Sequence, residues 1–272
     1  MDNRKPLFKT FGQTRSAFVL LAAIVFVTVI FRAFPEADIA ASAVFGASDG
    51  FAATQDPVLR ALRRLSINIM KALAIILVLM WILRLAVPGR NPELAFSKLG
   101  FATVSLLAGP ALVTNIILKD NWGRARPRQI EEFGGEASFA PAWDISDQCL
   151  SNCSFVSGET SSAIWLFTMV PFLPALWRMR AVILIGIYVF IVSAMRIGFG
   201  AHFLSDVLLS VLLNLTVFWL IFGLFFRRGE DLVARDWALE ETIAPKLARF
   251  GVIIGSAFRP IRYLLFLPFG KR

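Results

Sequence analysis

Six long runs of apolar residues constrain the fold of this chain more than any other feature. They lie at roughly 17–31, 67–87, 99–118, 160–177, 181–195 and 204–226. Each has about 15 to 23 residues, which is enough to cross a bilayer as a helix, although the shorter runs are marginal. Lipid satisfies no backbone N–H or C=O group, so the backbone of each run must be helical. We therefore predict an all-α, polytopic membrane bundle of about six transmembrane helices.

The charged residues support the membrane class and orient the chain. They make up 17% of the sequence, below the roughly 25% of a typical soluble domain. With the N-terminus in the cytoplasm, 18 of the 28 Lys and Arg residues fall on the inner side, as the positive-inside rule requires. Arg60, Arg63 and Arg64 fall on the outer side and fit the rule less well. We therefore place both termini in the cytoplasm. The net charge of +9 suits anionic lipid headgroups better than nucleic acid, because no basic stripe carries interleaved aromatics.

Two stretches lie outside the predicted spans. Residues 227–272 mix basic and apolar residues. They predict a cytoplasmic amphipathic tail with a C-terminal interfacial helix, after a membrane domain over residues 1–226. Residues 119–159 form a polar loop on the outer side that is too long for an idle connector. This loop holds both cysteines, Cys149 and Cys153. A disulfide, if the loop faces an oxidising compartment, and two free thiols both stay open.

Three polar clusters sit at the outer ends of different spans, where charged residues are costly and usually functional. They run over residues 119–128, 154–159 and 196–206. Lys119, Arg126 and Arg196 supply cations that suit phosphate oxygens. Ser157 and Gly158 lie where we expect a helix to begin, and the free N–H groups and dipole there favour an anion. The clusters together predict an anion-binding site.

His202 is the only histidine of the chain, and Asp206 follows it by four residues. In a helix this spacing is about one turn, so the carboxylate would reach the imidazole. Such a partner fixes the tautomer and makes the histidine a better nucleophile or base. Alone, the pair is a weak signal, because a single histidine near a helix end is more often structural.

Taken together, the three clusters resemble the motifs of the type 2 phosphatidic acid phosphatase superfamily. The matching pattern is Lys-x6-Arg-Pro, then Ser-Gly, then Arg-x5-His-x3-Asp. The resemblance implies that His202 is a nucleophile that forms a phospho-histidine, and that Asp206 orients it. It also implies that the phosphate is held, without a metal or cofactor, by five residues: Lys119, Arg126, Ser157, Gly158 and Arg196.

The sequence departs from the family pattern most clearly at Glu159. The second motif usually reads Pro-Ser-Gly-His, with the histidine as general acid for the leaving group, and here it reads Val156-Ser157-Gly158-Glu159. Three interpretations stay open: Glu159 is a general acid with a raised pKa, a ligand for a cationic group of the substrate, or a sign that activity is lost. A glutamate at this place and a large preceding loop are similar to some lipid A phosphatases.

The resemblance implies a lipid phosphatase in the inner membrane of a Gram-negative bacterium, with its active site at the periplasmic face. Candidate substrates are lipid A, phosphatidylglycerol phosphate, phosphatidate and undecaprenyl pyrophosphate. The alternatives are a lipid-to-lipid phosphotransferase and a non-enzymatic lipid-binding or transport protein, although the retention of His202 and Asp206 argues against the last. Arg124, Arg128 and Glu131 are interpreted either as headgroup contacts or as solvated loop charges.

Overall fold

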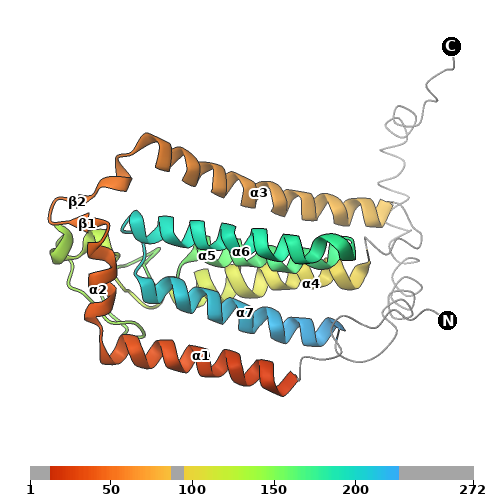
Figure 1. Ribbon diagram of the computed structural model, residues 1–272, viewed down its shortest axis with the longest axis horizontal. Helices are drawn as coiled ribbons and strands as arrows, with labels where there is room; N and C mark the ends of the chain where they lie inside the picture. The colour runs from red at the N-terminus through yellow and green to blue at the C-terminus, as the bar shows by residue number, and fades with distance from the viewer. Residues whose placement is uncertain (1–12, 87–94, 227–272) are drawn as a thin grey trace, which may run out of the picture.

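The computed structural model describes residues 13–86 and 95–226, and this part of the chain is a bundle of helices (Figure 1). Five helical stretches within it are long and apolar enough to cross a membrane. They comprise α1 (Gln13–Ala33), α3 (Pro57–Ala86), the continuous pair α4 (Phe96–Leu106) and η3 (Leu107–Lys119), α6 (Ala175–Gly198) and α7 (Leu204–Phe226). The predicted helical, multi-pass membrane class is confirmed.

The predicted span over 160–177 is shorter than expected. Here α5 (Gly158–Trp165) continues into a 3₁₀ helix, η6 (Leu166–Phe172), so the two have only eight and seven residues. The backbone becomes extended at Leu173, because a residue that precedes a proline, here Pro174, avoids the helical region. α5 packs between α6 and α7. It therefore contributes to the interior of the bundle more than to its lipid-facing surface.

α3 begins ten residues earlier than the predicted span over 67–87. Asp56 accepts hydrogen bonds from the backbone N–H groups of Val58 and Leu59 at 2.8 and 2.9 Å, which caps the helix start. Pro57 is the first helical residue, where its missing N–H costs nothing. Because of this earlier start, α3 reaches the loop end of the bundle, and Arg63 lies near that end of the helix.

η3 is a π-helix with Pro110 inside it. The amide of Asn115 donates to the carbonyl of Pro110 at 2.7 Å, so a side chain satisfies a backbone acceptor in this irregular segment. π-Helical segments occur frequently at functional sites. This one ends at Lys119, the first residue of the predicted anion site.

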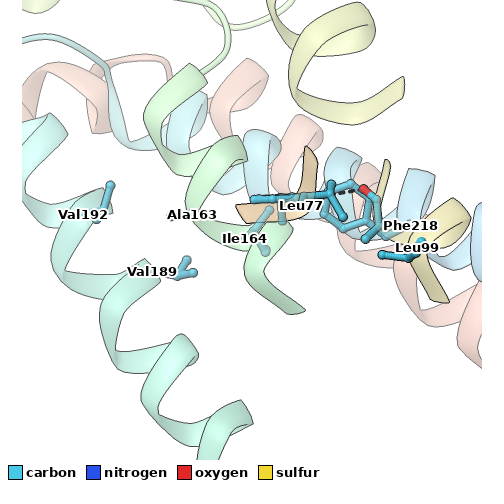
Figure 2. Close-up of a cluster of buried hydrophobic side chains, with 9 residues drawn as sticks. Leu77, Leu99, Ala163, Ile164, Val189, Val192 and Phe218 are labelled. Carbon is cyan, nitrogen blue, oxygen red and sulfur yellow. Dashed lines mark hydrogen bonds between the residues drawn. The ribbon is translucent and has the colours of Figure 1, made fainter. Parts of the chain in front are cut away.

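The core lies between α3, α4, α5, α6 and α7. Figure 2 shows one residue from each helix in this cluster: Leu77, Leu99, Ile164, Val189 and Phe218. By contrast, many large apolar side chains on α1, α3 and α6 are exposed, as expected for helices that face lipid.

The described chain ends, at the start of α1 and the end of α7, lie at one end of the bundle (Figure 1). At the other end lie α2 (Glu36–Ala43), the antiparallel pair β1 (Gly46–Ala47) and β2 (Gly50–Phe51), and the long loop. Short 3₁₀ turns complete this end: η1 (Ala52–Thr54), η4 (Pro127–Gln129) and η5 (Glu131–Phe133).

The arrangement agrees with both chain ends on one side of the membrane, but which side stays a prediction. The predicted tail over 227–272 lies outside the described residues.

Candidate active site

The three predicted clusters meet at the loop end of the bundle. Lys119 ends η3, Ser157 caps α5, and Arg196 lies in the last turn of α6. His202 lies in the short turn between α6 and α7. Because these helices pack together in the core, their ends bring the clusters side by side.

His202 is buried, with 1% of its surface exposed. Its Nδ1 lies 2.7 Å from the backbone carbonyl oxygen of Ser154. A carbonyl oxygen only accepts hydrogen bonds, which assigns the proton of the neutral ring to Nδ1 and the lone pair to Nε2. Burial lowers the pKa of His202, and the charges of Arg196, Lys119 and Arg126 lower it further. These influences favour a neutral ring with its proton on Nδ1 and its lone pair on Nε2.

The contact predicted between Asp206 and His202 is not the contact observed. His202 precedes the first residue of α7, so the helical spacing of four residues does not apply to it. Asp206 instead accepts from the Ser154 hydroxyl at 2.5 Å and from the Phe203 N–H at 2.9 Å. Asp206 therefore positions His202 indirectly, through the residue whose carbonyl oxygen contacts Nδ1.

Arg124 is neither a headgroup contact nor a solvated loop charge, and both interpretations of it are corrected. Its guanidinium is fully buried and donates to Asp206 at 2.5 Å and to Asp38, on α2, at 2.8 Å. It also donates to Ser205 Oγ at 2.9 Å and to the Ala140 carbonyl oxygen at 2.8 Å. Burial raises the pKa of Asp38, and the charge of Arg124 opposes this rise. These contacts join Arg124, Asp38, Ser205 and Asp206 in one buried network.

The charges of the predicted cations Lys119, Arg126 and Arg196 all lower the pKa of His202, so the three lie in its neighbourhood. Nη2 of Arg126 donates to the backbone and side-chain oxygens of Asn152, at 2.5 and 3.0 Å. Nε of Arg196 is buried without a hydrogen-bond partner. Lys119 makes no ion pair with any other residue in the described ranges. Donors of this kind, left unpaired beside a neutral histidine, suit an anion such as phosphate.

Ser157 and Gly158 lie at a helix start, as predicted. Ser157 is the N-cap of α5 and accepts from the Thr160 N–H at 3.4 Å. A Cβ atom at Gly158 would lie 3.1 Å from Nζ of Lys119, so a larger residue would push the ammonium group away. The glycine therefore lets the cation approach the start of the helix closely.

Glu159 is engaged by two arginines. Its Oε1 lies 2.8 Å from Nη2 of Arg63 and 2.9 Å from Nη1 of Arg196. Nε of Arg63 donates to the same carboxylate, at 3.1 Å. The site therefore contains an arginine from α3 that the predicted motifs do not include. Both guanidinium groups thus contact this carboxylate, and the role of Glu159 as a general acid stays a prediction.

Cys149 and Cys153 form a disulfide, so the first of the two open interpretations holds. The bond closes a small loop that contains Asn152, the partner of Arg126. The N–H of Cys153 donates to the Lys119 carbonyl oxygen at 3.3 Å. The disulfide loop thus contacts two of the predicted phosphate-binding residues.

Glu131 is exposed, as a solvated charge would be.

Several site residues could not be predicted from motifs: Asp38, Arg63, Asn152 and Ser154. For Arg63 a signal was present, because it lies on the side where the positive-inside rule expects few basic residues. For Asp38 the signal was a carboxylate among small apolar residues of α2. Neither signal identifies a partner.

Comparison with known proteins agrees with the predicted family. The sequence profile of the PAP2 superfamily matches residues 98–230. A lipid A 4'-phosphatase of Rhizobium leguminosarum is 47% identical over 128 residues, which cover 47% of this chain and 54% of the relative. One from Francisella tularensis subsp. novicida is 38% identical over 135 residues, covering 48% and 59%. The chain thus spans about half the length of these curated relatives.

The fold also has a solved counterpart. It is similar to the crystal structure of the first transmembrane PAP2 type phosphatidylglycerolphosphate phosphatase from Bacillus subtilis, with a TM-score of 0.50 and 19% sequence identity. The match covers 78% of this chain and 98% of that one. At this identity the likeness concerns the fold alone.

Proposed function

We propose that the chain is a membrane lipid phosphatase of the PAP2 superfamily that removes the 4'-phosphate of lipid A. The supporting observation is the contact between Nδ1 of His202 and the Ser154 carbonyl oxygen, which leaves Nε2 for the substrate, with Lys119, Arg126 and Arg196 near enough for their charges to lower the pKa of the ring. The relatives named as lipid A 4'-phosphatases support the substrate. The coarser activity, hydrolysis of a lipid phosphate monoester, rests on the family; the choice of lipid A rests on these relatives.

The mechanism we propose is a double displacement. Nε2 of His202 attacks the phosphorus, an N–P bond forms, and the bond to the lipid oxygen breaks, so that the lipid leaves as an alcohol after its oxygen takes a proton from a solvent water molecule. Water then attacks the phospho-histidine and releases inorganic phosphate. The three cations stabilise the charge on the phosphoryl oxygens throughout. Asp206 and Ser154 keep Nε2 aimed at the phosphate.

We further propose that this site faces the periplasm of a bacterial inner membrane. The number of basic residues on the predicted inner side supports this orientation, as does the disulfide, which persists in oxidising compartments. Single cysteines placed at 131–140 should react with a membrane-impermeant thiol reagent in intact spheroplasts. A cysteine in place of Arg178 should not react. The reverse pattern would overturn the orientation.

The direct test is phosphate release by the purified protein. Its substrates would be lipid A, phosphatidylglycerol phosphate, phosphatidate and undecaprenyl pyrophosphate, each with the folded His202→Ala protein as control. We expect lipid A to be the best substrate and to lose its 4'-phosphate. We expect His202→Ala to lose several powers of ten in turnover. Wild-type turnover in that variant would contradict the mechanism, and a better lipid substrate would overturn the assignment of lipid A. Phosphate that appears on a second lipid would instead indicate a phosphotransferase.

A further inference from the structure

Two arginines outside the predicted motifs flank the turn that leads to His202. Arg63, on α3, lies over the ring of Phe199, with its Cζ 5.9 Å from the ring centroid. Arg128, on η4, donates its backbone N–H to the carbonyl oxygen of Gly200 at 3.0 Å. The turn at 199–200, which precedes His202, thus contacts two cationic residues from remote parts of the chain.

The positive charges of these two arginines are not fully balanced by carboxylates in the described residues. Arg63 shares Glu159 with Arg196, so one carboxylate serves two guanidinium groups. Arg128 is exposed and makes no ion pair with any residue of 13–86 or 95–226. Burial and the charges of Arg128 and Arg63 lower the pKa of Arg126 to about 10. Burial and Arg63 also lower the pKa of Arg128. The cations are therefore close enough to repel one another, and an anion between them would relieve the repulsion.

A single phosphate does not use all of this charge. A phosphate monoester carries about two negative charges at neutral pH. Together with Glu159 it balances the inner cations Lys119, Arg126 and Arg196. The exposed Asp120 acts on Lys119, in the inner group. With Asp120 counted, five cations face four negative charges, so positive charge remains on the side of Arg63 and Arg128.

We propose that Arg63 and Arg128 form a second anion subsite, which binds a further phosphate or carboxylate group on the same lipid headgroup. The planar forks of two arginines suit such a group. The subsite would orient the headgroup so that one anion lies at His202 while the other lies at Arg63 and Arg128. Lipids with a single anionic group would lack the second contact. This inference rests on the proposed function, in that both anions belong to the substrate.

The test measures binding without turnover. The full-length His202→Ala protein, in neutral detergent micelles, is titrated with lipid A that carries both phosphates. A second titration uses lipid A that keeps only the 4'-phosphate. A hydrogen bond to a charged group contributes about 1.5–3 kcal/mol, which corresponds to roughly a 10- to 100-fold preference for the doubly phosphorylated lipid. Arg128→Gln in the same background should remove most of this preference. Arg64→Gln, which changes an exposed arginine next to Arg63 on α3, is the matched control and should keep it.

The possible results distinguish a failure of the second subsite from a failure of the proposed phosphatase function. Equal affinities for the two lipids, or an unchanged preference in Arg128→Gln, would overturn the second subsite. If Arg128→Gln weakens the binding of both lipids by the same factor, the arginine is a general membrane anchor and the proposal is also overturned. Phosphate release by the protein with His202 intact is measured in parallel. Its absence on both lipids contradicts the proposed function, whereas the affinity ratio still decides the subsite.

Discussion

Replacing Arg124 with leucine removes the cation that pairs with two carboxylates in a buried network. The guanidinium is fully buried and donates to Asp38, Asp206 and Ser205. Arg124→Leu leaves two carboxylates without this cation where water is excluded. Removing one partner of a buried ion pair typically costs about 3–5 kcal/mol. In a chain of this size, about 1 kcal/mol corresponds to about 2–4 °C, so we expect the melting temperature to fall by roughly 6–20 °C.

Thermal unfolding in detergent, followed by tryptophan fluorescence or circular dichroism, measures this loss. Arg128→Leu is the matched control, because it makes the same substitution four residues away on an exposed side chain. Such surface changes usually alter stability by less than about 0.5 kcal/mol. Equal melting temperatures for the two variants would refute the account of Arg124 as the residue that holds α2 against the start of α7.

Three further predictions concern the site itself. Because burial and three cations lower the pKa of His202, 15N NMR of a protein with a histidine-free tag should show a neutral ring at pH 6.5. Protonation should occur only at lower pH, and a charged ring at pH 6.5 would contradict the lowered pKa. Glu159→Gln should slow lipid A and p-nitrophenyl phosphate by similar factors, about 10-fold, because the carboxylate holds cations; a loss confined to the lipid, with its poor leaving group, would show that it is a general acid. Cys149→Ser should raise the KM about 5-fold, because Asn152 would hold Arg126 less firmly; steady-state kinetics that show an unchanged KM would refute this role of the disulfide.

The spans were the most predictable part of the fold. α7 begins where its apolar run does, because a polar turn precedes it. The start of α3 was placed too late, since Arg60, Arg63 and Arg64 interrupt the apolar run although the helix continues through them. Hydropathy detects contact with lipid, and it cannot distinguish a helix that extends beyond the bilayer from a loop.

The site was predictable only where its residues follow one another closely in the sequence. Ser157 and Gly158 could be assigned to a helix start from local pattern alone. The pairs Arg124–Asp38 and Arg63–Glu159 join residues that are 86 and 96 positions apart, and no local spacing encodes such contacts. The partner of His202 was missed for a related reason, because the predicted helical spacing ignores the turn that precedes α7.

Trapping the phosphorylated intermediate tests the central claim most directly. The purified protein is mixed with 32P-labelled lipid A and quenched in alkali within milliseconds, which preserves phospho-histidine. Because His202 is the only histidine of the chain, a base-stable, acid-labile label on untagged protein that is lost in His202→Ala identifies the residue. We predict such a label in the wild-type protein, with kinetics fast enough to precede phosphate release, and none in His202→Ala. Steady phosphate release without any labelled protein, or with a label that persists in His202→Ala, would contradict the account.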